Sequence, residues 1–424
     1  MNLTERLRSV VRGNGASLSP LYHPRGDPER VEESGSRGEA ERFAPQDTAD
    51  LLGGDWRDWQ GHQYLVVDRR YPPGHRHGRV AVADSAPDAN GSWPTLGLLT
   101  PAAAGGRVFF IDLETTGLSG GAGTYAFLIG CAWFEGAAFR VRQFLLTGFA
   151  AERGLLEAMR DTVGEAAAVA TYNGKTFDLP VLDTRCLLHR MSTPFDGLPH
   201  VDLLHPARQL WKSEEARLAA VEAFVLGHVR DGDIPGFEIP SRYFQYVRSG
   251  DPRPLAAVLE HNRLDLLSLA MLTARLAQLL EQGSGAAATA REALGLGRLY
   301  QRSGRYVDAR ACFARAIDMN GDASIRSDAL RAYAVLCRRA RHHDEAAHAW
   351  HELLELPACP AHVAREAREA LAVHCEHRLR DFKAARRLAI ESLQYEPSVA
   401  RTQAIQHRVA RLDRKLSPTT PSFF

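Results

Sequence analysis

The sequence lacks the features that mark secreted and membrane-spanning chains. It holds only six cysteines in 424 residues, and no two of them form a CxxC pair. Scattered cysteines argue against a disulfide framework or a cysteine zinc motif, and they are typical of a reducing compartment. No apolar run approaches the ~20 residues of a membrane helix, and the opening stretch MNLTERLRSVV lacks the apolar core of a signal peptide. We therefore expect a cytoplasmic protein with no membrane contact.

An excess of charge of one sign is also missing. The chain carries 52 Lys and Arg against 51 Asp and Glu, a net charge of +1. No global field therefore holds it on a nucleic acid or a membrane, and any contact with a polyanion must be local. Hydrophobic residues make up 45% of the chain and charged residues 24%, as in ordinary globular proteins. The length predicts two or three domains.

Composition and periodicity divide the chain into four segments. Residues 1–50 are poor in large apolar side chains and are expected to be flexible. Residues 51–106 read as a small β-rich element and a linker, with the strands QYLVVDRRY and RVAVA around the turn PPGHRHG. Residues 107–282 predict an α/β domain with a mixed sheet. Residues 288–416 contain no strand pattern and predict an all-α domain.

In the α/β segment, alternating and helical patterns follow one another in a definite order. Three strands, a helix and a fourth strand are followed by helices alone. The expected strands are 107–114, 124–135, 139–146 and 167–174, and the expected helices are 151–163, 179–190, 203–211, 216–226 and 254–280.

The helical segment contains a repeat that resembles tetratricopeptide helix pairs. The alternative interpretation is a generic helical bundle. The signature positions are Gly297, Tyr300, Gly304, Tyr306, Ala309, Phe313 and Ala316 in the first unit, Ala346 and Trp350 in the second, and Ala385 and Ala389 in the third, which Pro397 closes.

The stretch FFIDLETTGLSGG places two carboxylates at the end of an apolar strand. Asp112 and Glu114 are two residues apart, so both project from one face of that strand. Two like charges in such a place are costly unless a cation neutralises them. The pair therefore suggests a metal site, although acidic pairs at strand ends are often simply solvated.

Two further stretches strengthen the metal interpretation. YNGKTFD places Asp178 just before a helix, and HNRLD places His261 and Asp265 on one face of another. Carboxylate oxygens suit Mg²⁺ or Mn²⁺. Two such ions can promote phosphodiester hydrolysis, and a histidine can take the proton of the attacking water.

The three stretches DLETTG, NGKTFD and HNRLD, in that order, resemble the three exonuclease motifs of the DEDD (DnaQ-like) superfamily. The YprB-like ribonuclease H-like branch, some members of which carry a tetratricopeptide tail, resembles this chain most. The resemblance covers roughly residues 107–280. It implies a ribonuclease H-like mixed sheet with flanking helices, and a two-metal enzyme that removes nucleotides from 3′ ends.

The resemblance also implies roles for individual residues. Asp112 would bridge two ions, Glu114 and Asp265 would complete one site, and Asp178 would act at the other ion or behind it. His261 would be the general base. The nucleotide contacts would come from Thr115, Thr116, Gly117 and Leu118, with Asn173 either contacting a sugar, orienting Asp178 or serving as a turn residue.

One spacing departs from the pattern of the family. The histidine subgroup spaces its base and last aspartate one residue further apart, and the gap in HNRLD is that of the tyrosine subgroup. Tyr172 and Asn262 are therefore candidates to share the role of the base with His261.

Other polar residues have two interpretations each. Asp202 supports the site or caps the following helix, and Lys175 meets a phosphate or is merely exposed. His75 and His77 bind a metal or form a hairpin tip, and we favour the hairpin because no third ligand lies nearby in the sequence. The run LSGGAG is not followed by Lys-Ser or Lys-Thr, so it is a flexible turn and not a Walker loop.

These patterns support three hypotheses for function. The first is a 3′-5′ exonuclease acting on single-stranded DNA or RNA ends. The second is a structure-specific endonuclease of the same fold, and the third is a scaffold with a vestigial nuclease domain and partner-binding repeats. Residues 291–415 contain 23 Lys and Arg against 16 Asp and Glu, a net charge of +7, so the repeats are expected to contact nucleic acid or a protein partner.

Overall fold

The structure is a computed structural model. It describes residues 43–89, 91, 93–100, 106–117, 122–211, 216–319, 321–357, 359–393 and 398–417. Leu118 and Pro397, which the sequence pattern singled out, lie outside these residues, as does most of the segment 1–50. Among the described residues, no helix has the length and apolar character to cross a membrane.

A seven-stranded mixed sheet forms the centre of the α/β unit, with the strand order β1-β2-β7-β6-β5-β8-β9. β5, β8 and β9 run parallel, and the other neighbours are antiparallel. β3 and β4 form a separate small hairpin. The strands are β1 (Asp55–Trp59), β2 (His62–Tyr71), β3 (Arg76–His77), β4 (Val80–Ala81), β5 (Val108–Thr115), β6 (Ala126–Glu135), β7 (Ala138–Leu145), β8 (Ala168–Thr171) and β9 (His200–Asp202).

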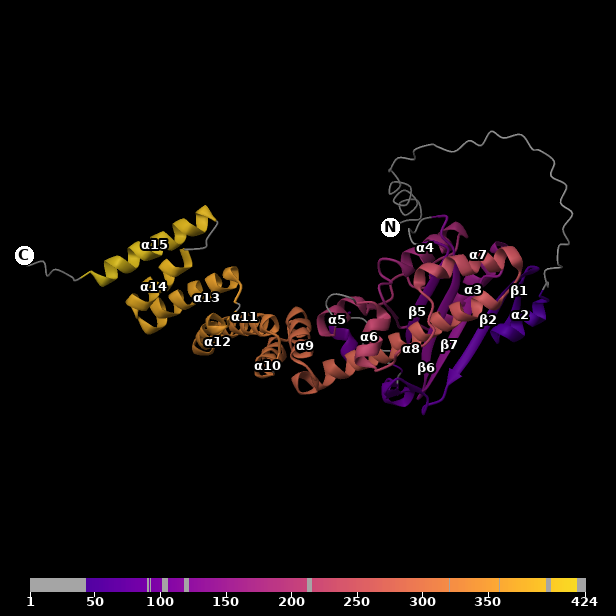
Figure 1. Cartoon of the computed structure of the whole chain (residues 1–424), viewed down its shortest axis with the longest axis horizontal. Helices are drawn as coiled ribbons and strands as arrows, with labels where there is room; N and C mark the ends of the chain where they lie inside the picture. Colours follow the sequence, from indigo (N-terminus) through magenta and orange to yellow (C-terminus); the bar gives the residue numbers. More distant parts are fainter. Residues whose placement is uncertain are drawn as a thin grey trace, which may run out of the picture.

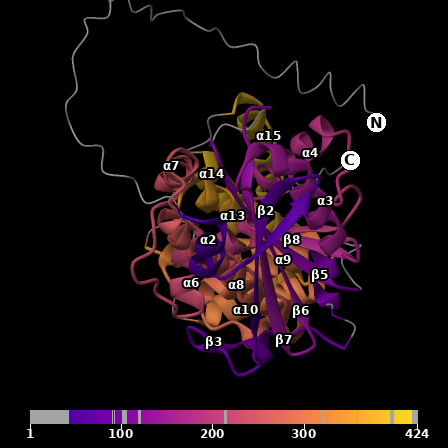
Figure 2. The ribbon, with the colours of Figure 1, turned by 90° about the vertical axis from the view of Figure 1, so that its right-hand side faces the viewer.

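The alternation of β5 divides its side chains between two hydrophobic cores. Val108 and Phe110 pack in one core with the long helix α8, while Phe109 and Ile111 pack in the other with α3. The two helices accordingly cover opposite faces of the sheet (Figure 2). Because a strand alternates its faces, the residues that follow Phe110 at even positions lie on the α8 side.

The helices of this unit are short except for α8, which runs for 30 residues. Every strand and helix expected between 107 and 282 is present, with ends shifted by a few residues. α2 and α7 were not expected, nor was β9. The helices are α2 (Pro45–Leu52), α3 (Glu152–Val163), α4 (Asp178–Leu188), α5 (Leu204–Leu210), α6 (Leu218–Val225), α7 (Ile239–Ser249) and α8 (Arg253–Gln282).

The region before β5 differs from the expectation in several ways. β1 was not expected, and the strand expected over 79–83 is reduced to β4, with a 3-10 helix at Val82–Ser85. β1 and β2 are not a separate element, because β2 pairs with β7 along seven residues from Leu65 to Tyr71. This pairing satisfies the backbone groups that a free sheet edge would expose. Residues 45–50, expected to be flexible, belong to α2, whose Leu52 is buried against the sheet.

In the described part of the chain after the α/β unit, the helices α9 to α15 follow one another and extend away from it (Figure 1). Most of the repeat positions of α10, α12 and α14 are buried, as in packed helix pairs, whereas Tyr306 at the start of α10 is exposed. The buried positions are Ala309, Phe313, Ala316, Ala346, Trp350, Ala385 and Ala389. The helices are α9 (Ala290–Arg302), α10 (Tyr306–Asp318), α11 (Ala323–Arg339), α12 (His343–Glu355), α13 (Ala361–His374), α14 (Phe382–Leu393) and α15 (Val399–Leu416).

The first helix pair shares a hydrophobic core with the α/β unit, across the expected domain boundary at 282–288. Leu294 and Phe313 belong to the same buried cluster as Phe110. The indole nitrogen of Trp211 donates to Glu292 over 2.9 Å. The helical region is therefore anchored to the sheet domain by burial and not by a loose linker.

Candidate functional site

Three elements carry the acidic residues to one place. Asp112 and Glu114 lie on the face of β5 that α8 covers, near its C-terminal end. Asp265 and His261 lie on α8, and Asp178 is the first residue of α4. Segments far apart in the chain therefore contribute to a single polar cluster, which we call the acidic cluster: Asp112, Glu114, Asp178 and Asp265.

The pKa values of these carboxyl groups reflect their proximity. Burial, followed by the charges of Asp265 and Glu114, raises the pKa of Asp112 well above its ordinary value. Burial, Asp265 and Asp178 act in the same direction on the pKa of Glu114. Burial, then Asp202 and Asp265, raise the pKa of Asp178 to about 7. Like charges gathered in a poorly solvated place favour proton uptake or the binding of a cation.

Asp112 is held by a buried asparagine. The Asn262 amide Nδ2 donates to Asp112 Oδ2 over 2.8 Å and to its backbone carbonyl over 3.1 Å. Asn262 Oδ1 in turn accepts from Gln143 Nε2 over 2.9 Å. Gly130 lies between Asp112 and Gln143 in the sheet, and a Cβ there would lie 2.4 Å from Asn262 Oδ1. Asn262 thus positions Asp112, and an amide is not a base.

Asp178 is presented by a tight turn between β8 and α4. Asn173 has a left-handed φ of 69°, and its Oδ1 accepts from Thr176 over 3.0 Å. Asp202 accepts from the backbone N–H groups of Asn173 and Lys175 over 2.8 and 3.1 Å. Asn173 is therefore a turn residue, and Asp202 fixes the turn that leads to Asp178.

Asp202 also accepts from the backbone of Leu204 over 3.1 Å, at the start of α5. Asp202 therefore both supports the turn at the site and caps the start of the following helix, as the two interpretations of this residue expected. Gly174 is required at the turn because a Cβ there would lie 2.5 Å from the Thr171 side chain.

His261 faces two carboxylates. Its Nδ1 lies 2.7 Å from Asp233 Oδ1, and its Nε2 lies 3.6 Å from Asp265 Oδ2. Burial alone would raise the pKa of Asp233, but hydrogen bonds from His261 and Arg230 lower it below its ordinary value. Asp233 is therefore an ionised carboxylate that fixes the orientation of the imidazole ring.

Arg230 joins three carboxylates in this region. Its guanidinium donates to Asp265 Oδ1 over 2.5 Å, to Asp233 Oδ2 over 3.0 Å and to Glu222 Oε2 over 2.6 and 2.9 Å. Burial would lower the pKa of Arg230, but the charges of Asp265 and Glu222 raise it above its ordinary value. Arg230 is thus a permanent cation beside the acidic cluster.

Four polar residues of this region were not predicted from the sequence: Glu222, His228, Arg230 and Asp233. They lie on α6 and on the loop that follows it, outside the three motifs. The one signal was the charged run HVRDGD between two helices, which no periodicity connects to α8.

The loop after β5 is braced by its own polar groups. Thr115 Oγ1 donates to the Gly117 carbonyl over 2.8 Å, and Thr116 Oγ1 accepts from the Tyr125 N–H over 3.0 Å. Tyr172, the alternative base, donates its phenol to the Ala216 carbonyl over 2.6 Å. Burial raises the pKa of that phenol, so it is a poor proton acceptor.

The ligand atoms of the acidic cluster lie further apart than those of a second polar group. Among the described residues, only His77, Glu222 and His228 bring three ligand atoms of His, Cys, Asp or Glu within 4.8 Å of one another. The carboxylates of the acidic cluster influence each other's pKa without closing to that extent, and one oxygen of Asp265 is held by Arg230.

Comparisons with known proteins agree with this geometry. Residues 109–277 match the family described as the RNase_H superfamily, and this range contains the acidic cluster and His261. The chain is also 32% identical over 364 residues to the uncharacterized protein YprB of Bacillus subtilis (strain 168), across 83% of this chain and 86% of that protein. The chain therefore belongs to the YprB family, and its residues 109–277 form a domain of the ribonuclease H superfamily.

Proposed function

We propose that this protein is a metal-dependent nuclease that hydrolyses phosphodiester bonds, acting as a 3′-5′ exonuclease on single-stranded DNA or RNA. The observation that carries the proposal is the gathering of Asp112, Glu114, Asp178 and Asp265 beside His261. Membership of the ribonuclease H superfamily agrees with a nucleic acid substrate.

The donor set fits hard divalent cations. It consists of carboxylate oxygens, which Mg²⁺ and Mn²⁺ prefer. Asp112 would bridge two ions, Glu114 and Asp265 would complete one site, and Asp178 would serve the other. When bound, such ions polarise the phosphodiester and stabilise the leaving oxygen. Asp265 has one oxygen on Arg230 and a second facing His261, so it can serve a cation without leaving Arg230.

His261 is the proposed general base. Neutral imidazole accepts a proton near pH 7, and Nε2 is the nitrogen on the Asp265 side. Asp233, 2.7 Å from Nδ1, holds the proton of the ring on that nitrogen and stabilises the imidazolium that forms. The same carboxylate keeps Nε2 available for the attacking water.

The loop after β5 is the proposed site of the terminal nucleotide. Thr115 and Thr116 use their side chains to brace the loop, so their backbone groups and Gly117 are the parts that can contact a sugar or base. Leu118 would add an apolar contact. Asn173 is not a direct contact in this proposal, because its side chain is engaged within the turn.

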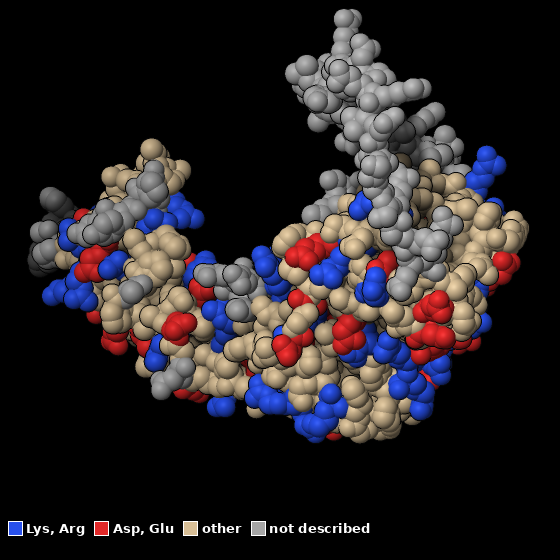
Figure 3. Space-filling view, turned by 45° about the vertical axis from the view of Figure 1, so that its right-hand side comes forward, with Lys and Arg blue, Asp and Glu red and all other residues tan. Residues whose placement is uncertain are grey.

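We also propose that the helical region is a tetratricopeptide-like array that helps to gather the substrate. A cleft of about 510 Å³ lies where α9 meets the α/β unit. Lys175, His200, His205 and Arg302 line it beside Asp202, which supports the Asp178 turn. On the face shown in Figure 3, basic and acidic side chains are interspersed. The cleft is our candidate for phosphate contacts because Lys175 and Arg302 line it.

The test is cleavage of end-labelled strands. With Mg²⁺ or Mn²⁺, the protein should shorten 5′-labelled single-stranded DNA or RNA stepwise from the 3′ end and release mononucleotides. Asp112→Asn should remove the activity, and Asp161→Asn, which changes an exposed carboxylate on α3, should keep it. Internal fragments as first products would favour the endonuclease. If the substrates stay intact both with Mg²⁺ and with Mn²⁺, the scaffold hypothesis, in which the repeats bind a protein, is the one that remains.

A further inference from the structure

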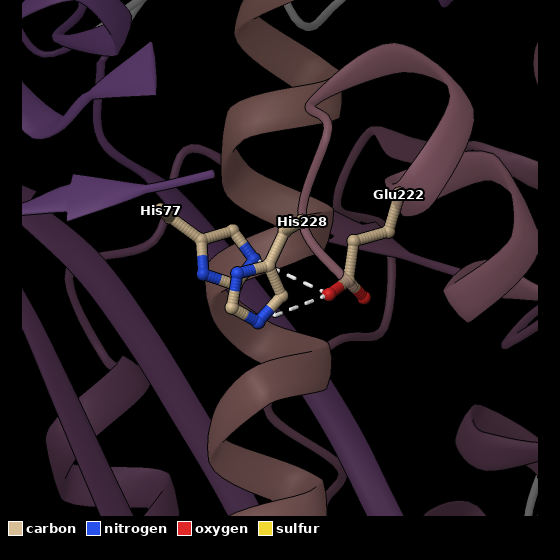
Figure 4. A group of neighbouring side chains, drawn as sticks. All are labelled: His77, Glu222 and His228. Atoms are coloured by element: carbon tan, nitrogen blue, oxygen red, sulfur yellow. Dashed lines mark ion pairs between the residues drawn. The ribbon is translucent and has the colours of Figure 1, made fainter. Parts of the chain in front are cut away.

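A second polar cluster is linked to the acidic cluster by Arg230, whose guanidinium donates to both Glu222 and Asp265. His77 comes from β3, Glu222 from α6 and His228 from the segment after α6 (Figure 4). Glu222 Oε1 lies 3.7 Å from His77 Nε2 and 3.5 Å from His228 Nε2. The two imidazole rings stack with their centroids 4.1 Å apart. Three elements distant in sequence thus aim two nitrogens at one carboxylate oxygen.

That oxygen has no hydrogen-bond partner. Glu222 is fully buried, and its Oε2 is taken by Arg230, but Oε1 is an unpartnered buried acceptor among the described residues. A buried carboxylate oxygen without a donor costs free energy that a cation would recover. His77 is 2% exposed, and burial, then His228, lower its pKa to about 3. Its imidazole is therefore neutral, which is the form that binds metals.

We propose that His77, Glu222 and His228 form a zinc site. Two imidazole nitrogens and one carboxylate oxygen are a zinc-type donor set, whereas Mg²⁺ prefers oxygen alone. Bond lengths of about 2.0–2.1 Å place tetrahedral ligands about 3.3 Å apart. The separations of 3.5 and 3.7 Å are therefore within a few tenths of an ångström of a closed site.

The exposure of His228 indicates from which side an ion would reach the cluster. The His228 side chain is 27% exposed, so an ion or a water ligand reaches the cluster from that side. Ser268 Oγ on α8 lies 2.7 Å from His77 Nε2, and it must release that nitrogen when the ion binds. His75 takes no part, because its ring packs against Tyr71 with centroids 4.7 Å apart.

An ion bound at the proposed zinc site would stabilise the loop that contacts the acidic cluster. A bound ion links the β3–β4 hairpin and α6 to the segment from His228 to Asp233. That segment carries Arg230, which binds Asp265, and Asp233, which binds His261. The proposal does not require nuclease activity, so it stands or fails separately from the proposed function.

The test is zinc content in the full chain. Wild type, His228→Ala and a matched control, His75→Ala, are dialysed against Zn²⁺ and measured by elemental analysis. Wild type and His75→Ala should hold about one more ion per chain than His228→Ala, whatever the acidic cluster binds in all three. Co²⁺ in place of Zn²⁺ should give the intense visible absorption of a four-coordinate site, and His228→Ala should lose it.

Equal zinc content in the three proteins, or a weak octahedral Co²⁺ spectrum in the wild type, would overturn the proposal. If His228→Ala does not fold, His228→Gln replaces it, because glutamine keeps polar volume but is a poor zinc ligand. The wild-type Co²⁺ spectrum needs no variant, and a weak octahedral spectrum there is sufficient by itself to overturn the proposal.

Discussion

Gly130 is the position at which one added methyl group should disturb both the sheet and the site. It lies beneath α8, between Asp112 and Gln143 in neighbouring strands. In Gly130→Ala, the new Cβ would lie 2.4 Å from Asn262 Oδ1 and 2.7 Å from Leu266 Cδ1. Either α8 moves away from the sheet, or the Asn262 amide turns and loses its bonds to Asp112 and Gln143.

The free-energy cost of each response is known approximately. Overpacking a core costs about 1–3 kcal/mol, and a buried amide left without partners costs about 1–3 kcal/mol. We expect Gly130→Ala to lower the free energy of unfolding by about 1–3 kcal/mol, because either response alone costs an amount in this range. Because Asn262 positions Asp112, the rate of hydrolysis should fall as well, by roughly 10²-fold if the carboxylate shifts by 1 Å.

The assay is urea denaturation beside a matched control. Gly148→Ala adds the same methyl group where nothing lies within 4 Å, at an extended backbone with φ −162°. Both substitutions restrict the unfolded chain equally, so their difference isolates the contact with α8. A Gly130→Ala protein as stable and as active as Gly148→Ala would refute the packing of Asn262 over Gly130.

Three more outcomes are expected. The pKa of Asp178, raised to about 7 by burial and then by neighbouring carboxylates, means that the folded state keeps a proton that the unfolded chain releases. The free energy of unfolding, measured by urea denaturation in a chelator, should therefore be greatest near pH 4 relative to that of Asp178→Asn. It should fall by at most about 4 kcal/mol as the pH rises through 7. Asp233→Asn should slow hydrolysis, by less than the roughly 10²–10⁴-fold that a lost general base costs, because the His261 imidazolium formed in the reaction loses its ionised partner. Replacing Lys175 and Arg302 with glutamine should weaken binding of single strands and flatten its salt dependence by about 0.7 in slope for each phosphate that is no longer neutralised.

Each of these outcomes has a control. Asp161→Asn removes an exposed carboxylate and should leave the pH dependence of stability as in the wild type. His261→Ala should lose at least as much rate as Asp233→Asn, and a larger loss in Asp233→Asn would contradict a purely positioning role. Arg331→Gln changes an exposed arginine of α11 that pairs with Glu366. If it flattens the salt dependence as much as the double variant, the cleft does not bind the substrate.

Local patterns predicted the elements that present the site. The run VFFIDLE predicts a buried strand ending in two carboxylates, and β5 has this form. The spacing of His261 and Asp265 predicts one helical face, which α8 supplies. These predictions succeed because periodicities of two and 3.6 residues are properties of short segments.

Features that depend on contacts between distant segments could not be read in this way. The pairing of β2 with β7 is set by which backbone edges meet, and strand periodicity does not specify a partner. Asn262 was a candidate to share the role of base because the spacing in HNRLD departs from that of the histidine subgroup, yet it faces Gly130 and Asp112 in the sheet. His77 lacked a third ligand in its own segment, and the fold supplies Glu222 and His228 from α6 and its loop.

The central claim is that the acidic cluster holds divalent cations. The most direct test is a crystal structure of the protein soaked with Mn²⁺, in which anomalous scattering locates each ion. We predict ions coordinated by carboxylate oxygens of Asp112, Glu114, Asp178 and Asp265. Well-occupied Mn²⁺ found only elsewhere, with these four carboxylates bound to protein groups alone, would contradict the claim.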